Sequence, residues 1–415
     1  MKNKKKIFVL IVLIILLILN FSFVYATDSN VQPSLVSEAA ILMDNKTNKI
    51  LFSKNENKKM YPASTTKIMT AILTIENSIL SENVTASYDA VSSIPDGYST
   101  ANIQVNETLT VEQLLQLLLV HSANDAANIL AEYVGGSIDS FVTMMNTKAH
   151  DLNLTGSHFT NTFGMHDENH YTTAFDLARL MQYCMKNDTF RKIAGSASCS
   201  IPATNKYGVR SYNSTNELII PKNKNYYQYV TAGKTGFTTQ AGDCLVSCSY
   251  KDNLELICVI LGGKTINGNS TRFSESRELY EYGYKNYSIK TLINKDSIVG
   301  QIEIKNATKD TKNLDLLISQ DITALVNNSE NYDNLVPEIN INETIQAPID
   351  EGTVIGTVSY DIDGIKYTSN LLASHYVEES KILEIILKIG ILVVVILLIF
   401  EIFHTKKKKT RKKFF

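Results

Sequence analysis

Residues 61–67 read Tyr-Pro-Ala-Ser-Thr-Thr-Lys, and apolar residues with helical spacing follow as far as Ile75. If Ser64 opens this helix, Lys67 lies one turn further along on the same face. A hydroxyl becomes a good nucleophile only when a base takes its proton, and a lysine can be that base only if its pKa is lowered. The stretch therefore offers a nucleophile and its base. The alternative role of Ser64 is an ordinary helix N-cap, since Ser-x-x-Lys occurs by chance on the order of once or a few times in such a chain.

A second short motif, Ser122-Ala123-Asn124, follows a leucine-rich helix predicted over residues 111–120. A segment just past a helix can hold a hydroxyl and an amide in a cleft. Ser122 could relay a proton to a leaving amine, and Asn124 could bind a backbone carbonyl of a substrate. By itself this triplet has no specificity.

A third motif, Lys234-Thr235-Gly236, is predicted to open a strand after Gly233. The Lys234 ammonium supplies a second cation and attracts a substrate carboxylate, to which Thr235 can donate a hydrogen bond. Gly236 lets an acyl chain approach the strand backbone, where any side chain would collide. The alternative is a turn lysine on an ordinary strand.

The segments around these motifs predict an α+β domain, in which a helical block packs on an antiparallel sheet. Residues 39–43 and 49–52 form a hairpin in this prediction, because turn-forming residues separate two apolar runs. Strands are also predicted at 244–250 and 254–261, and helices at 64–75, 111–120, 124–133, 138–152 and 173–186.

The chain changes character at residue 288, where alternating apolar and polar residues begin and continue to 376. Asp363-Gly364 between two such runs is a strong hairpin signal. Residues 288–376 are therefore predicted to form a small all-β sandwich domain.

Both ends of the chain carry membrane signals. Residues 1–26 have a lysine-rich start, an apolar stretch, and small residues at Val24 and Ala26, which predicts a signal peptide cleaved after Ala26. An uncleaved anchor is the alternative. Residues 385–403 are long and apolar enough to span a bilayer, and the basic residues of 404–415 favour a cytoplasmic tail. The body of the chain is then expected on the extracellular face, anchored to the cytoplasmic membrane. A helix lying on the membrane surface is the alternative at the C-terminus.

Composition excludes some functions. The net charge of −2 over 415 residues gives no field that favours nucleic acid. The five cysteines have no zinc-binding spacing and are interpreted as small buried apolar residues.

Together and in this order, the three motifs resemble the active-site serine set of penicillin-binding proteins and β-lactamases. Among these, the chain is most similar to the D-alanyl-D-alanine carboxypeptidases, the low-molecular-weight penicillin-binding proteins. The further segments that carry the resemblance are 122–127, 158–161, 170–178, 233–246 and 272–276. The resemblance implies a β-lactamase/transpeptidase-like catalytic domain, which we place at residues 33–287.

The resemblance also implies a mechanism. Ser64 attacks the carbonyl between the two D-alanines of a peptidoglycan stem peptide, and Lys67 accepts its proton. Backbone N–H groups of Ser64 and Phe237 form the oxyanion hole. Ser122 and Lys234 pass the proton to the departing D-alanine, and water hydrolyses the acyl-enzyme.

Substrate binding is implied for Asn124, Lys234, Thr235, Gly236 and, at the terminal carboxylate, Arg272. No metal or cofactor is expected, and β-lactams are expected to be covalent inhibitors. The second motif departs from the family pattern, because Ala123 stands where glycine is usual, after His121.

Two alternative functions fit the sequence less well. A class A β-lactamase needs a glutamate in a Glu-x-x-Leu-Asn context. The glutamates between the second and third motifs are Glu132, Glu168 and Glu217, and none of them has this context. A wall-binding protein without activity is disfavoured because every required side chain is present. A metal site formed by His158, His166 and His170 is also disfavoured.

Overall fold

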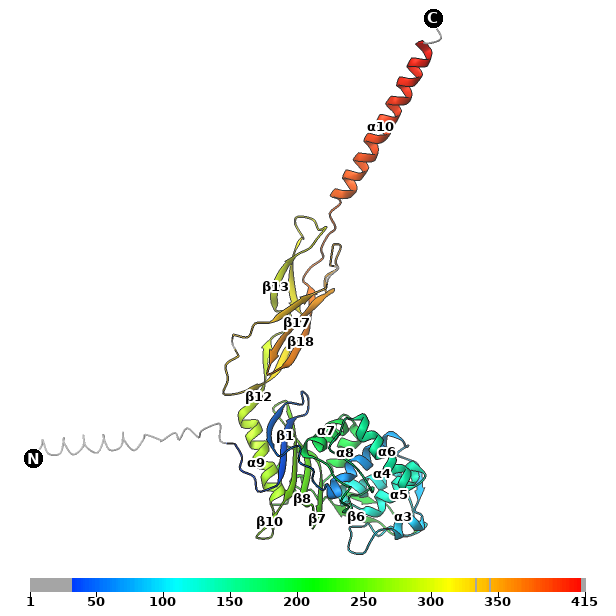
Figure 1. Cartoon of the computed structure of the whole chain (residues 1–415), viewed down its shortest axis with the longest axis vertical. Helices are drawn as coiled ribbons and strands as arrows, with labels where there is room; N and C mark the ends of the chain where they lie inside the picture. Colours follow the sequence, from blue (N-terminus) through cyan, green and yellow to red (C-terminus); the bar gives the residue numbers. More distant parts are fainter. Residues whose placement is uncertain (1–31, 333, 343–344, 412–415) are drawn as a thin grey trace, which may run out of the picture. The chain divides into compact units, whose positions relative to one another are not determined.

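The computed structural model describes residues 32–332, 334–342 and 345–411, so the predicted signal peptide lies outside the described residues. Figure 1 shows the whole chain. The chain divides into two compact units. The first ends at Ser288 and also takes in Asn327–Ser329; the second contains Ile289–Val326 and the chain from Glu330 onward.

The first unit is built on a five-stranded antiparallel sheet with the order β2-β1-β9-β8-β7. The strands are β1 (Ala39–Asp44), β2 (Ile50–Lys54), β7 (Val230–Thr238), β8 (Gly242–Lys251) and β9 (Leu254–Gly263). The predicted hairpin of residues 39–43 and 49–52 is confirmed as β1 and β2. The strands predicted at 244–250 and 254–261 are confirmed as β8 and β9. The prediction that the third motif opens a strand is wrong. Strand β7 begins at Val230, and Lys234 lies in its middle, because β8 is long enough to pair with the whole of it.

Helices cover both faces of this sheet (Figure 1). Because side chains alternate along a strand, Ile41 and Met43 enter the main core while Leu42 lies on the opposite face. On that face helix α9 (Thr271–Asn286) packs closely, since a Cβ added at Gly283 would lie 2.8 Å from the Leu42 side chain.

The helical block packs on the other face. Its helices are α2 (Lys67–Glu76), α3 (Tyr88–Ser92), α4 (Val111–Gln116), α5 (Asn124–Gly135), α6 (Ile138–Asp151), α7 (Ala174–Cys184) and α8 (Asp188–Ala194). Three two-stranded antiparallel sheets complete the unit: β3 (Asn83–Thr85) with β4 (Thr108–Thr110), β5 (Ser198–Ile201) with β6 (Arg210–Asn213), and β10 (Thr265–Ile266) with β11 (Asn269–Ser270).

Two predicted helices have irregular ends that matter for the site. The helix expected over 64–75 begins as a 3₁₀ turn, Ala63–Thr66, before α2. The helix expected over 111–120 is α4 followed by a π-helical turn, Leu117–His121. Ser122 ends that turn in the left-handed conformation, with φ +67°.

Ahead of the C-terminal helix that begins at Ile382, the second unit is built of strands, as predicted. One sheet has the order β13-β14-β18-β17-β16, and β12 pairs with β15. The strands are β12 (Tyr287–Ile293), β13 (Ile298–Glu303), β14 (Asn313–Ile318), β15 (Ile322–Asn327), β16 (Glu338–Ile341), β17 (Val354–Ile362) and β18 (Ile365–Ala373). Asp363 and Gly364 join β17 to β18 with φ values of +54° and +79°, as a tight hairpin turn requires.

Helix α10 (Ile382–Arg411) contains the predicted span. Its segment Glu384–Thr405 is long and apolar enough to cross a membrane, and none of that segment is buried within the chain. Four of the five cysteines are buried, and all five are free thiols.

Candidate active site

The turn that carries Ser64 is held by a hydrogen bond within it and by two neighbours, His170 and Gly164. The Thr66 hydroxyl donates to the Ala63 carbonyl at 2.8 Å and lies 2.8 Å from Nε2 of His170. Ala63 has φ +46°, a conformation that alanine rarely adopts. Gly164 lies against it so closely that an added Cβ would be 1.8 Å from the Ala63 carbonyl oxygen. The strained turn persists because its surroundings hold it.

The 3₁₀ geometry of this turn aligns Ser64 with Lys67, since side chains three residues apart eclipse each other in a 3₁₀ helix. Nζ of Lys67 lies 2.8 Å from Oγ of Ser64, 2.5 Å from Oδ1 of Asn124 and 3.4 Å from Oγ of Ser122. The Lys67 side chain is fully buried. Three residues from two distant motifs therefore meet at one nitrogen.

Burial lowers the pKa of Lys67 well below its usual value, and the positive charge of Lys234 lowers it further. The carboxylate of Asp125 acts in the opposite direction but is the smallest of the three effects. A buried lysine with a second cation nearby can exist as a neutral amine, which is the form that can accept a proton.

Lys234 joins the same network from strand β7. Its Nζ donates to Oγ of Ser122 at 2.9 Å and to the Thr235 carbonyl at 2.8 Å. Burial lowers the pKa of Lys234 to about 7, with a further contribution from the guanidinium of Arg272. The left-handed backbone of Ser122 turns its hydroxyl toward both lysines, so an unbroken chain of polar contacts runs from Ser64 to Lys234.

Strand β7 lies at the edge of the sheet and passes directly beside the serine turn. A Cβ at Gly236 would lie 2.9 Å from the backbone nitrogen of Ser64, so only glycine fits this approach. Phe237 follows with an exposed side chain. The Thr235 hydroxyl lies 2.6 Å from that of Thr215, and Arg272 donates to the Gly236 carbonyl at 2.9 Å.

Arg272 is also paired with Asp243 of β8, at 3.5 Å. Its guanidinium therefore touches the backbone of the third motif rather than the lysine–serine network. The structure thus brings together Ser64, Lys67, Ser122, Asn124 and Lys234, while the other predicted site residues border them along β7.

A cleft of about 420 Å³ opens at Ser64. The predicted residues Asn124 and Phe237 line it, and the lining residues that sequence reasoning missed are Gly97, Tyr98, Ser99, Phe163, Gly164, Thr238, Thr239 and Gln240. Tyr98 and Phe163 pack edge to face, with ring centroids 6.2 Å apart. Residues 95–100 have neither helical nor strand periodicity, so no sequence pattern indicated that Tyr98 reaches the cleft.

Asp125 is another residue of the site that the sequence prediction did not include. Its buried carboxylate accepts hydrogen bonds from the backbone N–H groups of Ala101 and Ile103, at 3.0 and 2.9 Å. These bonds fasten the segment that carries Tyr98 to the start of helix α5. Burial raises the pKa of Asp125, and the backbone donors lower it. The available signal was its position directly after Asn124.

The histidines noted in the sequence, and the tyrosine Tyr227 near the third motif, have structural partners. His170 accepts from the backbone N–H of Thr160 at 3.0 Å, and burial lowers its pKa to about 4. His121 packs on the ring of Tyr212. Tyr227 is buried and stacks on Tyr280, with ring planes 6° apart. In the part of the chain that the structure describes, no three potential ligands are grouped to hold a metal ion.

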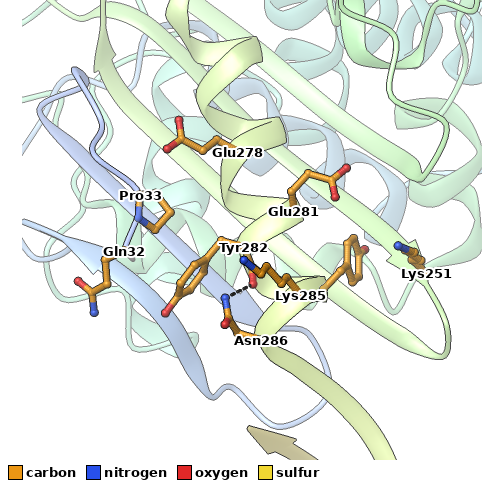
Figure 2. Close-up of a pocket in the computed structure, with 9 residues that line it drawn as sticks. Gln32, Pro33, Lys251, Glu278, Glu281, Tyr282, Lys285 and Asn286 are labelled. Carbon is orange, nitrogen blue, oxygen red and sulfur yellow. Dashed lines mark hydrogen bonds between the residues drawn. The ribbon is translucent and has the colours of Figure 1, made fainter. Parts of the chain in front are cut away.

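A second pocket of similar size lies along helix α9 (Figure 2). Its lining includes Lys251, Glu278, Glu281 and Tyr282, and none of the predicted site residues belongs to it. We therefore assign the candidate site to the cleft at Ser64.

Comparisons with known proteins agree with this geometry. The sequence profile of the D-alanyl-D-alanine carboxypeptidase family matches residues 26–265, and that of the C-terminal domain of penicillin-binding protein 5 matches residues 287–379. D-alanyl-D-alanine carboxypeptidase DacF of Bacillus subtilis (strain 168) is 30% identical over 333 residues, which cover 79% of this chain and 82% of DacF.

Two solved structures have the same fold. Penicillin-binding protein 5 from Haemophilus influenzae superposes with a TM-score of 0.64 at 26% identity, covering 84% of this chain and 99% of that chain. PBP3 from Streptococcus pneumoniae superposes with a TM-score of 0.71 at 22% identity, over 83% and 100% of the two chains. The resemblance inferred from the three motifs is confirmed: the chain belongs to the D-alanyl-D-alanine carboxypeptidase family of hydrolases.

Proposed function

We propose that this chain is a serine-type enzyme that removes the terminal D-alanine from peptidoglycan stem peptides through an acyl-enzyme, and that β-lactams acylate it at Ser64. The observation that carries the proposal is the contact chain Ser64–Lys67–Ser122–Lys234, in which both lysines are buried and have lowered pKa values. Such a chain supplies a nucleophile, its base and a return path for the proton.

In the acylation step, Oγ of Ser64 bonds to the carbonyl carbon between the two D-alanines, and its proton passes to neutral Lys67. The oxygen that becomes negative accepts from the backbone N–H groups of Ser64 and Phe237, a term worth about 3–4 kcal/mol per donor in such sites. The carbon–nitrogen bond then breaks, and the amine of the departing D-alanine takes the proton through Ser122 and Lys234. Water later attacks the ester, which frees the peptide carboxylate and restores the Ser64 hydroxyl.

Substrate orientation follows from the edge of β7. The terminal carboxylate pairs with the Lys234 ammonium and accepts from Thr235, while the peptide backbone lies along the strand past Gly236. An extended peptide adds to a sheet edge in this way because the edge has unpaired N–H and C=O groups. The side-chain amide of Asn124 faces the same cleft and can donate to a substrate carbonyl. Arg272 supports the strand from its far side through the Gly236 carbonyl.

The membrane places the enzyme near its substrate in this proposal. The apolar helix Glu384–Thr405 anchors the chain, and the basic residues that follow stay on the cytoplasmic side. The catalytic unit then lies on the extracellular face, where peptidoglycan is found. Removal of residues 382–415 is expected to release an active enzyme from the membrane fraction.

The decisive experiment is mass spectrometry of D-alanine released from a muramyl pentapeptide, with the wild-type protein compared with Ser64→Ala. Release by wild type and none by the variant is expected. A fluorescent penicillin should label wild type and leave Ser64→Ala unlabelled. Release of D-alanine by Ser64→Ala at the wild-type rate would exclude the serine mechanism.

A further inference from the structure

A second groove adjoins the active-site cleft. This outer groove, of about 440 Å³, is lined by Glu38, Lys58, Lys59, Met60, Tyr61, Glu168, Tyr171 and Gln240. Gln240 lines the outer groove and the cleft alike. Tyr61 lies three residues before Ser64 in the chain. A ligand that follows the cleft past Gln240 therefore enters the outer groove.

The direction of the bound peptide points to this groove. In the proposed complex the terminal carboxylate lies at Lys234 and Thr235, and the reacting carbonyl lies at the N–H of Phe237. The peptide therefore runs antiparallel to β7, and the residue before the acyl D-alanine continues toward Gln240. Strand β7 ends at Thr238, and the turn residues Thr239 and Gln240 continue the wall of the cleft beyond the end of the strand. A further peptide residue with a long side chain would lie beside this turn.

The walls of the outer groove are firmly built. Met60 and Thr172 exchange two backbone hydrogen bonds of 2.8 Å, and His158 and Tyr171 exchange two more, of 2.8 and 3.1 Å. The ammonium of Lys59 lies 4.0 Å from the centroid of the Tyr171 ring. A cation–π contact of this kind holds Lys59 in position without neutralising its charge.

The groove presents one free charge of each sign. Lys58 is paired with Glu38 at 2.7 Å, so these two charges compensate each other. Within the described part of the chain, neither the ammonium of Lys59 nor the carboxylate of Glu168 has an ion-pair or hydrogen-bond partner, and both residues are exposed. A ligand group that carries both a carboxylate and an ammonium would complement this pair.

We propose that the outer groove binds the side chain of the residue that precedes the acyl D-alanine, and that it selects a side chain ending in both an ammonium and a carboxylate. Lys59 binds the carboxylate and Glu168 binds the ammonium. This assignment rests on the proposed function and adds its substrate class: stem peptides whose third residue is a diamino dicarboxylic acid.

The test uses three N-acetylated tripeptides X-D-Ala-D-Ala and the full chain. Residue X is diaminopimelate, with a zwitterionic end, or lysine, with an ammonium alone, or Nε-acetyl-lysine, which is neutral. For wild type, kcat/KM is expected to be highest for diaminopimelate and lowest for acetyl-lysine. Lys59→Gln should lower the ratio of diaminopimelyl to lysyl turnover by about three- to fivefold, the usual worth of an exposed ion pair. Glu168→Gln should lower the ratio of lysyl to acetyl-lysyl turnover by a similar factor of about three to five.

The matched control is Lys46→Gln, which removes an exposed lysine from the β1–β2 turn and should change neither ratio. Equal turnover of the three peptides by wild type overturns the groove assignment, and so do variants that slow all three alike. These outcomes are distinct from failure of the proposed function, in which wild type releases no D-alanine from any peptide and takes no penicillin at Ser64.

Discussion

The Nζ atom of Lys234 lies 2.9 Å from the Oγ atom of Ser122, although 112 positions separate the two residues in the sequence. The same hydroxyl lies 3.4 Å from Nζ of Lys67, so two buried ammonium groups meet at one oxygen. Burial and mutual repulsion disfavour two positive charges there. Loss of a proton from Lys67 relieves both costs and produces the base that the Ser64 hydroxyl requires.

Replacement of Lys67 by arginine should abolish this base, because a guanidinium stays protonated at every working pH. Acylation by a fluorescent penicillin is expected to slow by about 100- to 10,000-fold, the usual contribution of a general base. In wild type the acylation rate should rise with pH as Lys67 loses its proton, at a pH well below the usual lysine pKa. Labelling of Lys67→Arg at the wild-type rate would show that another group is the base.

Loss of the proton from Lys234 should weaken substrate binding at alkaline pH. Its pKa is lowered to about 7 by burial and by Arg272, so the free enzyme loses the ammonium as the pH rises past that value. Only the charged form attracts the terminal carboxylate, so KM for the pentapeptide should increase above pH 7 while a substrate amide that lacks this carboxylate shows no such increase. Steady-state kinetics between pH 6 and 9 test this. A KM that is constant over this range contradicts the assignment.

Gly164→Ala should be much more harmful than Gly136→Ala. Both glycines have positive φ, of +90° and +74°, which costs an alanine on the order of 1 kcal/mol. At Gly136 nothing lies within 4 Å of an added Cβ, whereas at Gly164 the Cβ would lie 1.8 Å from the Ala63 carbonyl oxygen. The melting temperature should therefore decrease slightly for Gly136→Ala and strongly for Gly164→Ala. Only Gly164→Ala should slow penicillin acylation at Ser64.

His170 should make the catalytic unit sensitive to acid. Its pKa is about 4 in the folded chain, because it is buried, against 6.5 in an exposed imidazole. Between these pH values the imidazole is protonated in the unfolded chain and neutral in the folded chain. The free energy of unfolding therefore falls as the pH drops from 6.5 toward 4, by about 3 kcal/mol in all. Urea unfolding of both proteins across this pH range measures how steeply the free energy of unfolding depends on pH, and the dependence should be weaker for His170→Gln than for wild type.

The control for that experiment is His150→Gln, since the His150 side chain is 92% exposed. It should retain the full pH dependence of wild type. If His170→Gln retains it as well, the acid sensitivity comes from other groups.

Sequence patterns predicted the regular parts of this chain correctly where turn residues and apolar spacing agreed. The hairpin of β1 and β2 and the β17–β18 turn at Asp363-Gly364 are examples, because local chemistry specifies both. The start of β7 was predicted wrongly, since pairing with β8 rather than local preference extends that strand back to Val230. The left-handed Ser122 at the end of a π-helical turn has no local signature either.

The sequence by itself determined which chemical groups this protein has and in what order, and that order was enough to indicate the family. Only the tertiary structure decided which groups meet: Asp125 at the backbone of Ala101, Thr215 at Thr235, and His170 beneath the turn of Ser64. It also decided the basicity of Lys67 and Lys234. The physical reason is that the pKa of a lysine depends on how completely folding removes water and on which charges the rest of the chain brings near, and neither is a property of the residues beside it in sequence.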